Sequence, residues 1–223
     1  MLAENARYAE EILPFWNALD KRQKSLAMEK LIERYWEKGK IIHSNEDCTG
    51  LLMVIKGQLR SFILSEYGRE ITLYRLFEGD VCILSSSCMM RNITFDIHLE
   101  AEKDSKILIM PAHVFKQLSE SNLAVKDFQA EMVSARLSDV MWVMEQVVFM
   151  SMDRRLADFL LEQASIEGND ELLITHEAIA RNLGTAREVV TRMLRYFQDE
   201  GMVTLSRGRV VIKDRKKLMN YTR

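Results

Sequence analysis

The sequence contains little cysteine, proline or glycine: its 223 residues include 3 Cys, 2 Pro and 9 Gly. With so few residues that break regular structure, we expect neither a long flexible linker nor a low-complexity tail. Cys48, Cys82 and Cys88 form no CxxC pair and no even-numbered set. This argues against a disulfide framework and for a reducing compartment.

Long apolar runs are also missing. No stretch of about 18 uncharged apolar residues is present, so no segment is expected to span a membrane. The N-terminus carries Glu4 early and lacks the apolar core of a secretion signal. At 48% hydrophobic and 29% charged residues, the composition is typical of globular proteins. We therefore expect a cytoplasmic protein.

The sequence lacks the residue sets that enzymes use. No Ser/His/Asp set, carboxylate pair or phosphate-binding glycine loop occurs at a recognisable spacing. The histidines, His43, His98, His113 and His176, are scattered without the spacing of metal ligands. We therefore expect no enzymatic activity, no catalytic residue and no bound metal.

Positive charge gathers at one end of the chain. The net charge is −2, and residues 1–150 hold 18 Lys and Arg against 22 Asp and Glu. Residues 181–223 hold 11 Lys and Arg against only 4 Asp and Glu. A basic segment of this kind suits the phosphates of a nucleic acid, although a solvated basic surface would give the same composition.

Two patterns divide the first half. Residues 1–36 have the pattern of short amphipathic helices interrupted at Pro14, with Leu26, Leu31 and Tyr35 on the apolar side. From Gly39 to Pro111, short β-rich runs alternate with turn residues, which predicts a β-barrel or sandwich. The runs are Leu51–Ile55, Leu59–Leu64, Ile71–Leu76, Ile93–Leu99 and Ile107–Met110.

A short helix is expected over 112–121, followed by a long one over 122–150 that contains no Gly or Pro. Apolar residues in the long helix recur at alternating steps of four and three, the spacing of a coiled-coil seam. Because the helix makes about eight turns, more than a small barrel can cover, we expect a homodimer. The alternative is that the stripe packs on its own barrel. The stripe consists of Val133, Leu137, Val140, Met144 and Val147.

Residues 151–223 predict a second unit, with a helix over 153–166 and an apolar segment at 172–174. Thr175 is a suitable N-cap for a following helix, and Gly184 supplies the positive φ that a tight turn needs. Thr185 is expected to cap a second helix, which completes a helix-turn-helix. The expected buried face of that second helix is Val189, Val190 in part, Met193, Leu194 and Phe197.

The outward face of the second helix is rich in arginine. Arginine can bind guanine O6 and N7, and glutamate can accept from cytosine N4. Behind it, residues 202–212 predict a β-hairpin wing whose basic tip would reach a phosphate or the minor groove. The alternative is a helical hairpin with a charged, solvent-facing side. The expected DNA-binding residues are Thr175, His176, Arg187, Glu188, Thr191, Arg192, Arg195, Arg207 and Arg209.

The order of these parts resembles the CRP/FNR family of transcription regulators over nearly the whole chain. Arg187-Glu188-Val189-Val190-Thr191-Arg192 is similar to the family's R-E-T-V-x-R recognition helix, and Val54-Ile55-Lys56-Gly57 and Glu78-Gly79-Asp80 resemble its barrel turns. The resemblance implies an α+β fold in three parts. These are a cyclic-nucleotide-binding-like β-barrel (jelly roll) over 1–121, a dimerisation helix over 122–150 and a winged helix-turn-helix over 151–223.

By position, the resemblance implies that Arg187, Glu188 and Arg192 read bases in double-stranded DNA. The site would be a palindrome with half-sites close to TGTGA, bound by a homodimer. The FNR-type pattern has no Arg at the first of these positions. The resemblance also implies RNA polymerase as a protein partner.

The sensor departs from the cyclic-AMP-binding branch of the family. Where that branch has Gly-Glu-Leu and Arg-Ser, this chain has Ile83-Leu84-Ser85 and Phe95-Asp96, and Val140-Met141 replaces Thr-Ser. A cyclic phosphate needs a cation and aligned donors, and Asp96 would repel it. We therefore expect a small apolar effector instead of cyclic AMP, in a pocket that includes Arg136. The alternative is a barrel that binds nothing and only shapes the dimer.

Cysteine sensing is the remaining alternative. Iron–sulfur sensing in the family requires N-terminal cysteines, and the first here is Cys48, so no iron–sulfur cluster is expected. Cys82 and Cys88 could form a reversible disulfide, although free cysteines are commonly small core residues. A ligand-independent or thiol-redox-modulated regulator of the same family therefore stays open. So does a regulator that acts on a protein partner through its barrel.

Overall fold

The structure, a computed structural model, describes residues 2–44, 49–83 and 97–222. Its contacts divide the chain into two compact units. One contains residues 1–64 and 73–140, and the other contains residues 65–72 and 141–223. The expected domain limits, 1–121, 122–150 and 151–223, stay a prediction.

Short helices open the first unit: α1 (Leu2–Ile12), the 3-10 helix η1 (Trp16–Ala18) and α2 (Lys21–Lys30). Pro14 follows α1, as expected from its inability to continue a helix. The Asp20 carboxylate accepts from the backbone N–H groups of Arg22 and Gln23, at 2.7 and 2.8 Å. Gln23 Oε1 accepts in return from the Asp20 N–H at 3.0 Å. This reciprocal capping fixes where α2 begins.

Strand β1 (Ile32–Trp36) shows that the helical pattern expected over 1–36 is wrong at its end. It pairs antiparallel with β8 (Ser105–Met110), with Ile32 opposite Ile109. Tyr35, expected on the apolar side of a helix, is 62% exposed. β-branched and aromatic residues favour a strand here, but the partner strand lies far along the chain, where local periodicity cannot reveal it.

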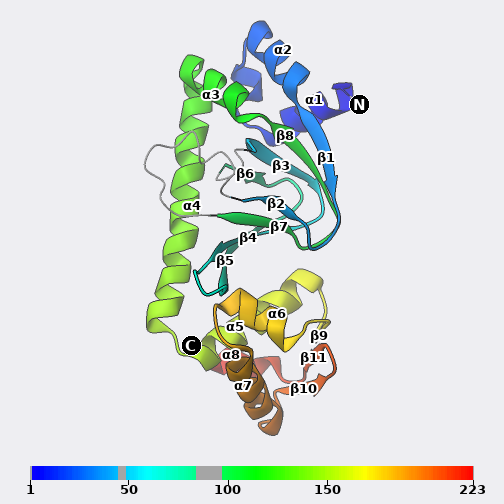
Figure 1. Ribbon diagram of the computed structural model, residues 1–223, viewed down its shortest axis with the longest axis vertical. Coiled ribbons are helices and arrows are strands. Elements are labelled where there is room, and N and C mark those ends of the chain that lie inside the picture. Colours follow the sequence, from blue (N-terminus) through cyan, green and yellow to red (C-terminus); the bar gives the residue numbers. More distant parts are fainter. Residues whose placement is uncertain (1, 45–48, 84–96, 223) are drawn as a thin grey trace. The chain divides into compact units, whose positions relative to one another are not determined.

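The described strands of the first unit form two four-stranded sheets, in the orders β1-β8-β3-β6 and β2-β7-β4-β5 (Figure 1). In β3, residues 51–54 are fully buried, so both faces of this strand are covered. The bounds are β2 (Ile41–His43), β3 (Leu51–Lys56), β4 (Leu59–Leu64), β5 (Glu70–Leu76), β6 (Val81–Cys82) and β7 (His98–Ala101).

Most of the expected β-runs are confirmed as β3, β4, β5 and β8. The run expected over 93–99 is described only from residue 97, and β7 begins at His98. The short strands β2 and β6 were not expected. A barrel of antiparallel strand pairs followed by helices confirms the α+β fold class.

Gly57 makes the tight turn between β3 and β4. Its φ is +102°, and a Cβ there would lie 2.6 Å from the carbonyl oxygen of Asp104. The neighbouring Ser105 hydroxyl donates to the Lys103 carbonyl at 2.6 Å and accepts from the Gln58 N–H at 3.2 Å. Only glycine fits this close backbone approach.

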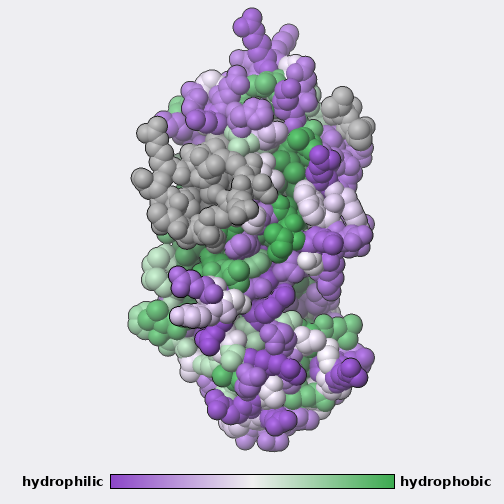
Figure 2. All heavy atoms as spheres, in the orientation of Figure 1, coloured by the Kyte–Doolittle hydropathy of each residue, from purple (hydrophilic) through white to green (hydrophobic). Residues whose placement is uncertain are grey.

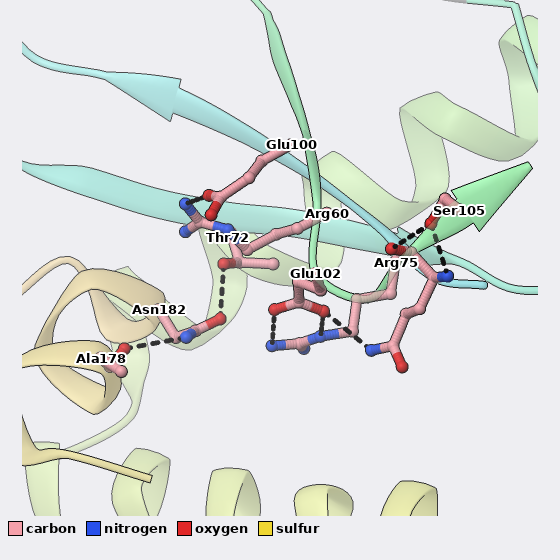
Figure 3. Close-up of polar contacts among 9 residues, drawn as sticks. Arg60, Thr72, Arg75, Glu100, Glu102, Ser105, Ala178 and Asn182 are labelled. Atoms are coloured by element: carbon pink, nitrogen blue, oxygen red, sulfur yellow. Dashed lines mark hydrogen bonds and ion pairs between the residues drawn. The ribbon is translucent and has the colours of Figure 1, made fainter. Parts of the chain in front are cut away.

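Two charged pairs connect β4 and β5 of the β2-β7-β4-β5 sheet with Glu100 of β7 and with Glu102, just after β7 (Figure 3). Arg60 Nη2 on β4 lies 2.6 Å from Glu100 Oε2, directly opposite on β7. Arg75 Nε on β5 donates to Glu102 Oε2 at 2.8 Å, and Gln58 Nε2 donates to the same oxygen at 2.8 Å. The Arg60–Glu100 pair lies directly across two neighbouring strands and therefore favours one register of the sheet.

Helices α3 (Ala112–Ser121) and α4 (Leu123–Phe149) follow the barrel, as expected for 112–121 and 122–150. Asn122 lies between them, and its Nδ2 donates to the Ala18 carbonyl at 2.9 Å. Near the start of α4, buried Phe128 packs edge-on against Phe15 with ring centroids 5.1 Å apart. These contacts hold the N-terminal part of α4 to the first unit.

The second unit surrounds a core of its own. It contains α5 (Met152–Glu167), β9 (Glu171–Leu172), α6 (His176–Leu183), α7 (Arg187–Asp199), β10 (Val203–Ser206), β11 (Arg209–Ile212) and α8 (Arg215–Tyr221). The strands form one sheet in the order β10-β11-β9. Leu156 and Leu160 of α5 are fully buried in this core. Helix α8, which was not expected, places the Tyr221 ring 5.4 Å from that of Phe197.

Candidate nucleic-acid interface

Helix α6 begins as the sequence predicts. The Thr175 hydroxyl accepts from the backbone N–H of Ala178 at 3.1 Å, which is N-capping by a side chain. Ile179 and Ala180 are buried in the core of the second unit. The capping residue and the buried face together set the direction of α6.

The turn between α6 and α7 depends on Gly184. It has φ +65°, and its N–H donates to the Ala180 carbonyl. The Thr185 N–H also donates to Ala180, at 3.1 Å. The expectation that Thr185 caps α7 is wrong: the N-cap is Ala186, which has no capping side chain. The turn uses the backbone of Thr185, so the helix begins one residue later.

Helix α7 has one buried and one exposed face. Val190, Leu194 and Phe197 are fully buried, whereas Val189 and Met193 are only partly covered. The buried face of α7 is therefore centred on Val190, Leu194 and Phe197. The opposite face lines a shallow open hollow made by Arg187, Glu188, Thr191, Arg192, Arg195, Tyr196 and Asp199.

The arginines on this face are available to a ligand. Arg187, Arg192 and Arg195 are exposed, and no ion pair within the described part of the chain engages any of them. Glu188 is exposed beside Arg187. An exposed helix face with free guanidinium groups is suited to the major groove of DNA.

The wing is a β-hairpin of β10 and β11, with Ser206 opposite Arg209. Gly208 lies at its tip with φ +71°, next to exposed Arg207. Arg209 Nη1 is instead 2.6 Å from Glu171 Oε1 on β9. Of the two arginines expected to reach DNA, Arg207 is therefore the less restrained.

His176, the first residue of α6, connects the two helices of the motif. Its Nδ1 lies 3.0 Å from the Thr191 hydroxyl on α7. Burial, followed by the positive charges of Arg187 and Arg195, lowers the pKa of His176. The sequence placed both residues near DNA but did not reveal this contact, because the two are far apart along the chain.

Two family models match this chain. Residues 33–122 match the cyclic nucleotide-binding domain, and residues 154–221 match the Crp-like helix-turn-helix domain. A solved structure from Eubacterium rectale, of a protein assigned to the crp/fnr family of transcriptional regulators, is 52% identical. It has a TM-score of 0.93, and the match covers 95% of this chain and 99% of that one. The chain belongs to the CRP/FNR family.

Other CRP/FNR-type proteins are more distant. The cAMP-activated global transcriptional regulator CRP of Pasteurella multocida is 22% identical over 187 residues, which are 81% of this chain and 88% of that protein. The c-di-GMP-responsive global regulator CLP of Xanthomonas campestris has a TM-score of 0.74 at 17% identity, covering 87% of this chain and 100% of that one. By name these two respond to different effectors, so a shared fold does not identify the effector here.

The CRP/FNR long helix, α4, carries an exposed apolar surface (Figure 2). Leu137 is 61% exposed, so the barrel of the first unit does not cover it, and Met144, which belongs to the second unit, is 51% exposed. No described helix, α4 included, is long and apolar enough to cross a membrane. The other stripe residues are Val133 and Val147, which are exposed, and Val140, which is half-buried; Trp142, Val148 and Phe149 are exposed beside them.

In the CRP/FNR barrel, Arg136 of α4 lies over the ring of Tyr74 of β5, with 4.4 Å between the guanidinium carbon and the ring centroid. Arg136 Nη1 also pairs with Asp139 Oδ2 at 2.8 Å. The Tyr74 hydroxyl is 3.8 Å from Cys82 Sγ, and burial raises the pKa of Tyr74 well above its ordinary value. Sequence reasoning selected Arg136 but missed Tyr74, because a tyrosine within a β-rich run belongs to no motif.

Much of the expected effector pocket cannot be placed. Leu84, Ser85, Phe95, Asp96 and the cysteines Cys48 and Cys88 lie outside the described residues. Ile83 is fully buried and Met141 is 48% exposed. The pocket as a whole therefore stays a prediction.

Proposed function

We propose that this chain is a homodimeric transcription regulator that reads a palindromic DNA site in the major groove. The observation that carries the proposal is the orientation of α7. Because Val190 and Leu194 face the core, Arg187 and Arg192 face outward without ion-pair partners among the described residues. Membership of a family of transcription regulators supports the same function.

The outward residues suggest which bases are read. Arg187 and Arg192 would each bind guanine O6 and N7, and Glu188 would accept from cytosine N4. We propose half-sites close to TGTGA, as the resemblance to the family's recognition helix implies. Arg195, Arg207 and the start of α6 at Thr175 would bind phosphates and so fix the register on DNA.

Replacing Arg187 with alanine tests this reading. At each half-site one bidentate contact contributes about 1–3 kcal/mol, so the affinity for a TGTGA palindrome should fall by about tenfold or more. The affinity for a scrambled duplex should fall much less. Fluorescence anisotropy on both duplexes at one salt concentration measures the difference.

Arg207→Ala is the matched control for this experiment. Arg207 is a wing arginine expected to bind phosphate, so its loss should weaken both duplexes to the same extent. Equal losses on the two duplexes for Arg187→Ala would contradict the base-reading role. Circular dichroism of each variant checks that the fold is kept.

The dimer would form along the exposed stripe of α4. Apolar residues at alternating steps of three and four pair two helices, and Leu137 and Met144 are open to such a partner. The two copies of α7 would then lie about 34 Å apart, one turn of DNA. We propose domain limits of 1–121, 122–150 and 151–223, and RNA polymerase as a further partner.

A small effector that is not cyclic AMP would act through the barrel. The departures at Ile83-Leu84-Ser85, Phe95-Asp96 and Val140-Met141 support an apolar ligand. The alternatives are a ligand-independent regulator and one modulated by thiol redox chemistry. Native mass spectrometry of the purified protein distinguishes these, since a bound metabolite adds its own mass and a disulfide removes two hydrogens.

A further inference from the structure

The His176–Thr191 contact joins the two helices that hold DNA in the proposed function. His176 begins α6, and Thr191 lies on the exposed side of α7 together with Arg187 and Arg195. The distance of 3.0 Å between Nδ1 and the hydroxyl oxygen is that of a hydrogen bond. The imidazole is therefore held at the edge of the arginine-rich surface.

A threonine hydroxyl can hold this ring in both of its protonation states. When the imidazole is neutral with its proton on Nε2, the hydroxyl donates to Nδ1; when it is charged, Nδ1–H donates to the hydroxyl oxygen. Nε2–H is a donor in both states. Gaining a proton therefore changes the charge of the ring without requiring it to turn.

The surroundings of His176 favour the neutral ring when no DNA is bound. Burial lowers its pKa most, followed by Arg187 and Arg195, which both lie on α7. Among the described residues, no carboxylate offsets these causes, although Glu177 follows His176 on α6 and Glu188 follows Arg187 on α7. The DNA-free protein therefore leaves this site largely without its proton near neutral pH.

We propose that His176 binds a DNA backbone phosphate as an imidazolium, so that DNA binding takes up one proton from solvent at each subunit. The inference rests on the proposed DNA-binding function. A phosphate oxygen accepts from Nε2–H and stabilises the positive ring. A neighbouring phosphate binds Arg195, and the negative charge of the duplex screens the repulsion from Arg187, which weakens two of the causes that keep the ring neutral.

The sign of the pH effect follows from linkage. Because the DNA complex holds more protons than the free protein, affinity is highest at low pH. It declines as pH rises above the free-state pKa and through the bound-state pKa of His176. We expect the affinity to fall about tenfold between about pH 6 and about pH 8.

Fluorescence anisotropy over this pH range, on the palindrome and on a scrambled duplex, tests the inference with His176→Gln. Glutamine keeps hydrogen-bonding groups but cannot take up a proton, so its pH profile should be nearly flat on both duplexes. His113→Gln, at an exposed histidine on α3, is the matched control and should keep the wild-type slope. A wild-type slope in His176→Gln would overturn the inference.

Thr191 is a positioning residue in this scheme, and its variants give a second test. Thr191→Val keeps the shape but removes the hydroxyl, so the pH slope should shrink; Thr191→Ser should restore it. The NMR titration of the His176 ring should move to higher pH when DNA is added. An unmoved titration would overturn the proton uptake alone, whereas a wild-type protein that binds neither duplex at any pH would overturn the proposed function as well.

Discussion

Gly184 determines how α7 leaves α6. Its φ of +65° is a conformation that costs residues with a Cβ about 1–2 kcal/mol. Its N–H and that of Thr185 both donate to the Ala180 carbonyl, so the turn depends on this one backbone conformation. Helix α7, which we propose reads bases, therefore takes its direction from a residue with no proposed DNA contact.

Gly184→Ala should lower the free energy of unfolding by about 1–2 kcal/mol and also weaken DNA binding, because the turn relaxes and α7 shifts. Gly168→Ala is the control: Gly168 ends α5 with φ +64°, and a Cβ there meets open space. It should lose similar stability and keep its DNA affinity. Chemical denaturation and anisotropy measure both quantities; unchanged binding by Gly184→Ala would refute the role of the turn.

At the residue scale, the sequence predicted the local roles of single residues better than their contacts with distant parts of the chain. Thr175 caps α6 and Gly184 turns the chain as expected, because both roles depend on neighbouring residues. The ion pair of Arg209 with Glu171 depends on a strand from elsewhere in the chain. No pattern around Arg209 could show that its guanidinium has a partner.

At the element scale, the length and apolar period of α4 could be predicted from the sequence, whereas the strand β1 could not. A run without Gly or Pro shows a repeating apolar stripe within its own residues. Strand β1 is defined by its pairing with β8, which local sequence does not contain. The structure shows in addition that Leu137 and Met144 of this stripe are exposed, so a second copy of the chain could pack against them.

Leu137→Glu should break the proposed dimer. An unpaired charge buried at the seam costs about 3–5 kcal/mol, so the dimer dissociation constant should rise by about 100-fold or more. Ser138→Glu, at an exposed position beside the stripe, should leave assembly unchanged. Sedimentation equilibrium gives both constants, and a dimeric Leu137→Glu protein would show that copies meet elsewhere.

At the scale of the whole molecule, the architecture could be predicted from the charge distribution and from the order of the barrel, the long helix and the winged helix-turn-helix along the chain. The excess of positive charge over 181–223 coincides with the helix-turn-helix and wing. The identity of any effector could not be predicted in the same way, because a binding pocket in the barrel would be formed by side chains that converge from several strands and α4. Arg136 over Tyr74 is one such meeting that no motif could predict.

Cyclic AMP should leave the DNA affinity of this protein unchanged. By the resemblance to the cyclic-AMP-binding branch, we expect the positions that hold the cyclic phosphate to carry other residues here, among them Asp96, which would repel it. Anisotropy with and without cyclic AMP measures this, with a cAMP-activated CRP such as that of Pasteurella multocida as the positive control. Tighter DNA binding in the presence of the nucleotide would show that the barrel recognises it by other residues.

The open stripe of α4 has a consequence for gene control in the cell. If two copies must meet before either can hold a palindrome, promoter occupancy follows the square of the protein's abundance while monomers predominate. A twofold change in synthesis then changes occupancy about fourfold. The seam would thus act as a threshold, giving a sharper response to expression level than a monomeric repressor or activator could provide.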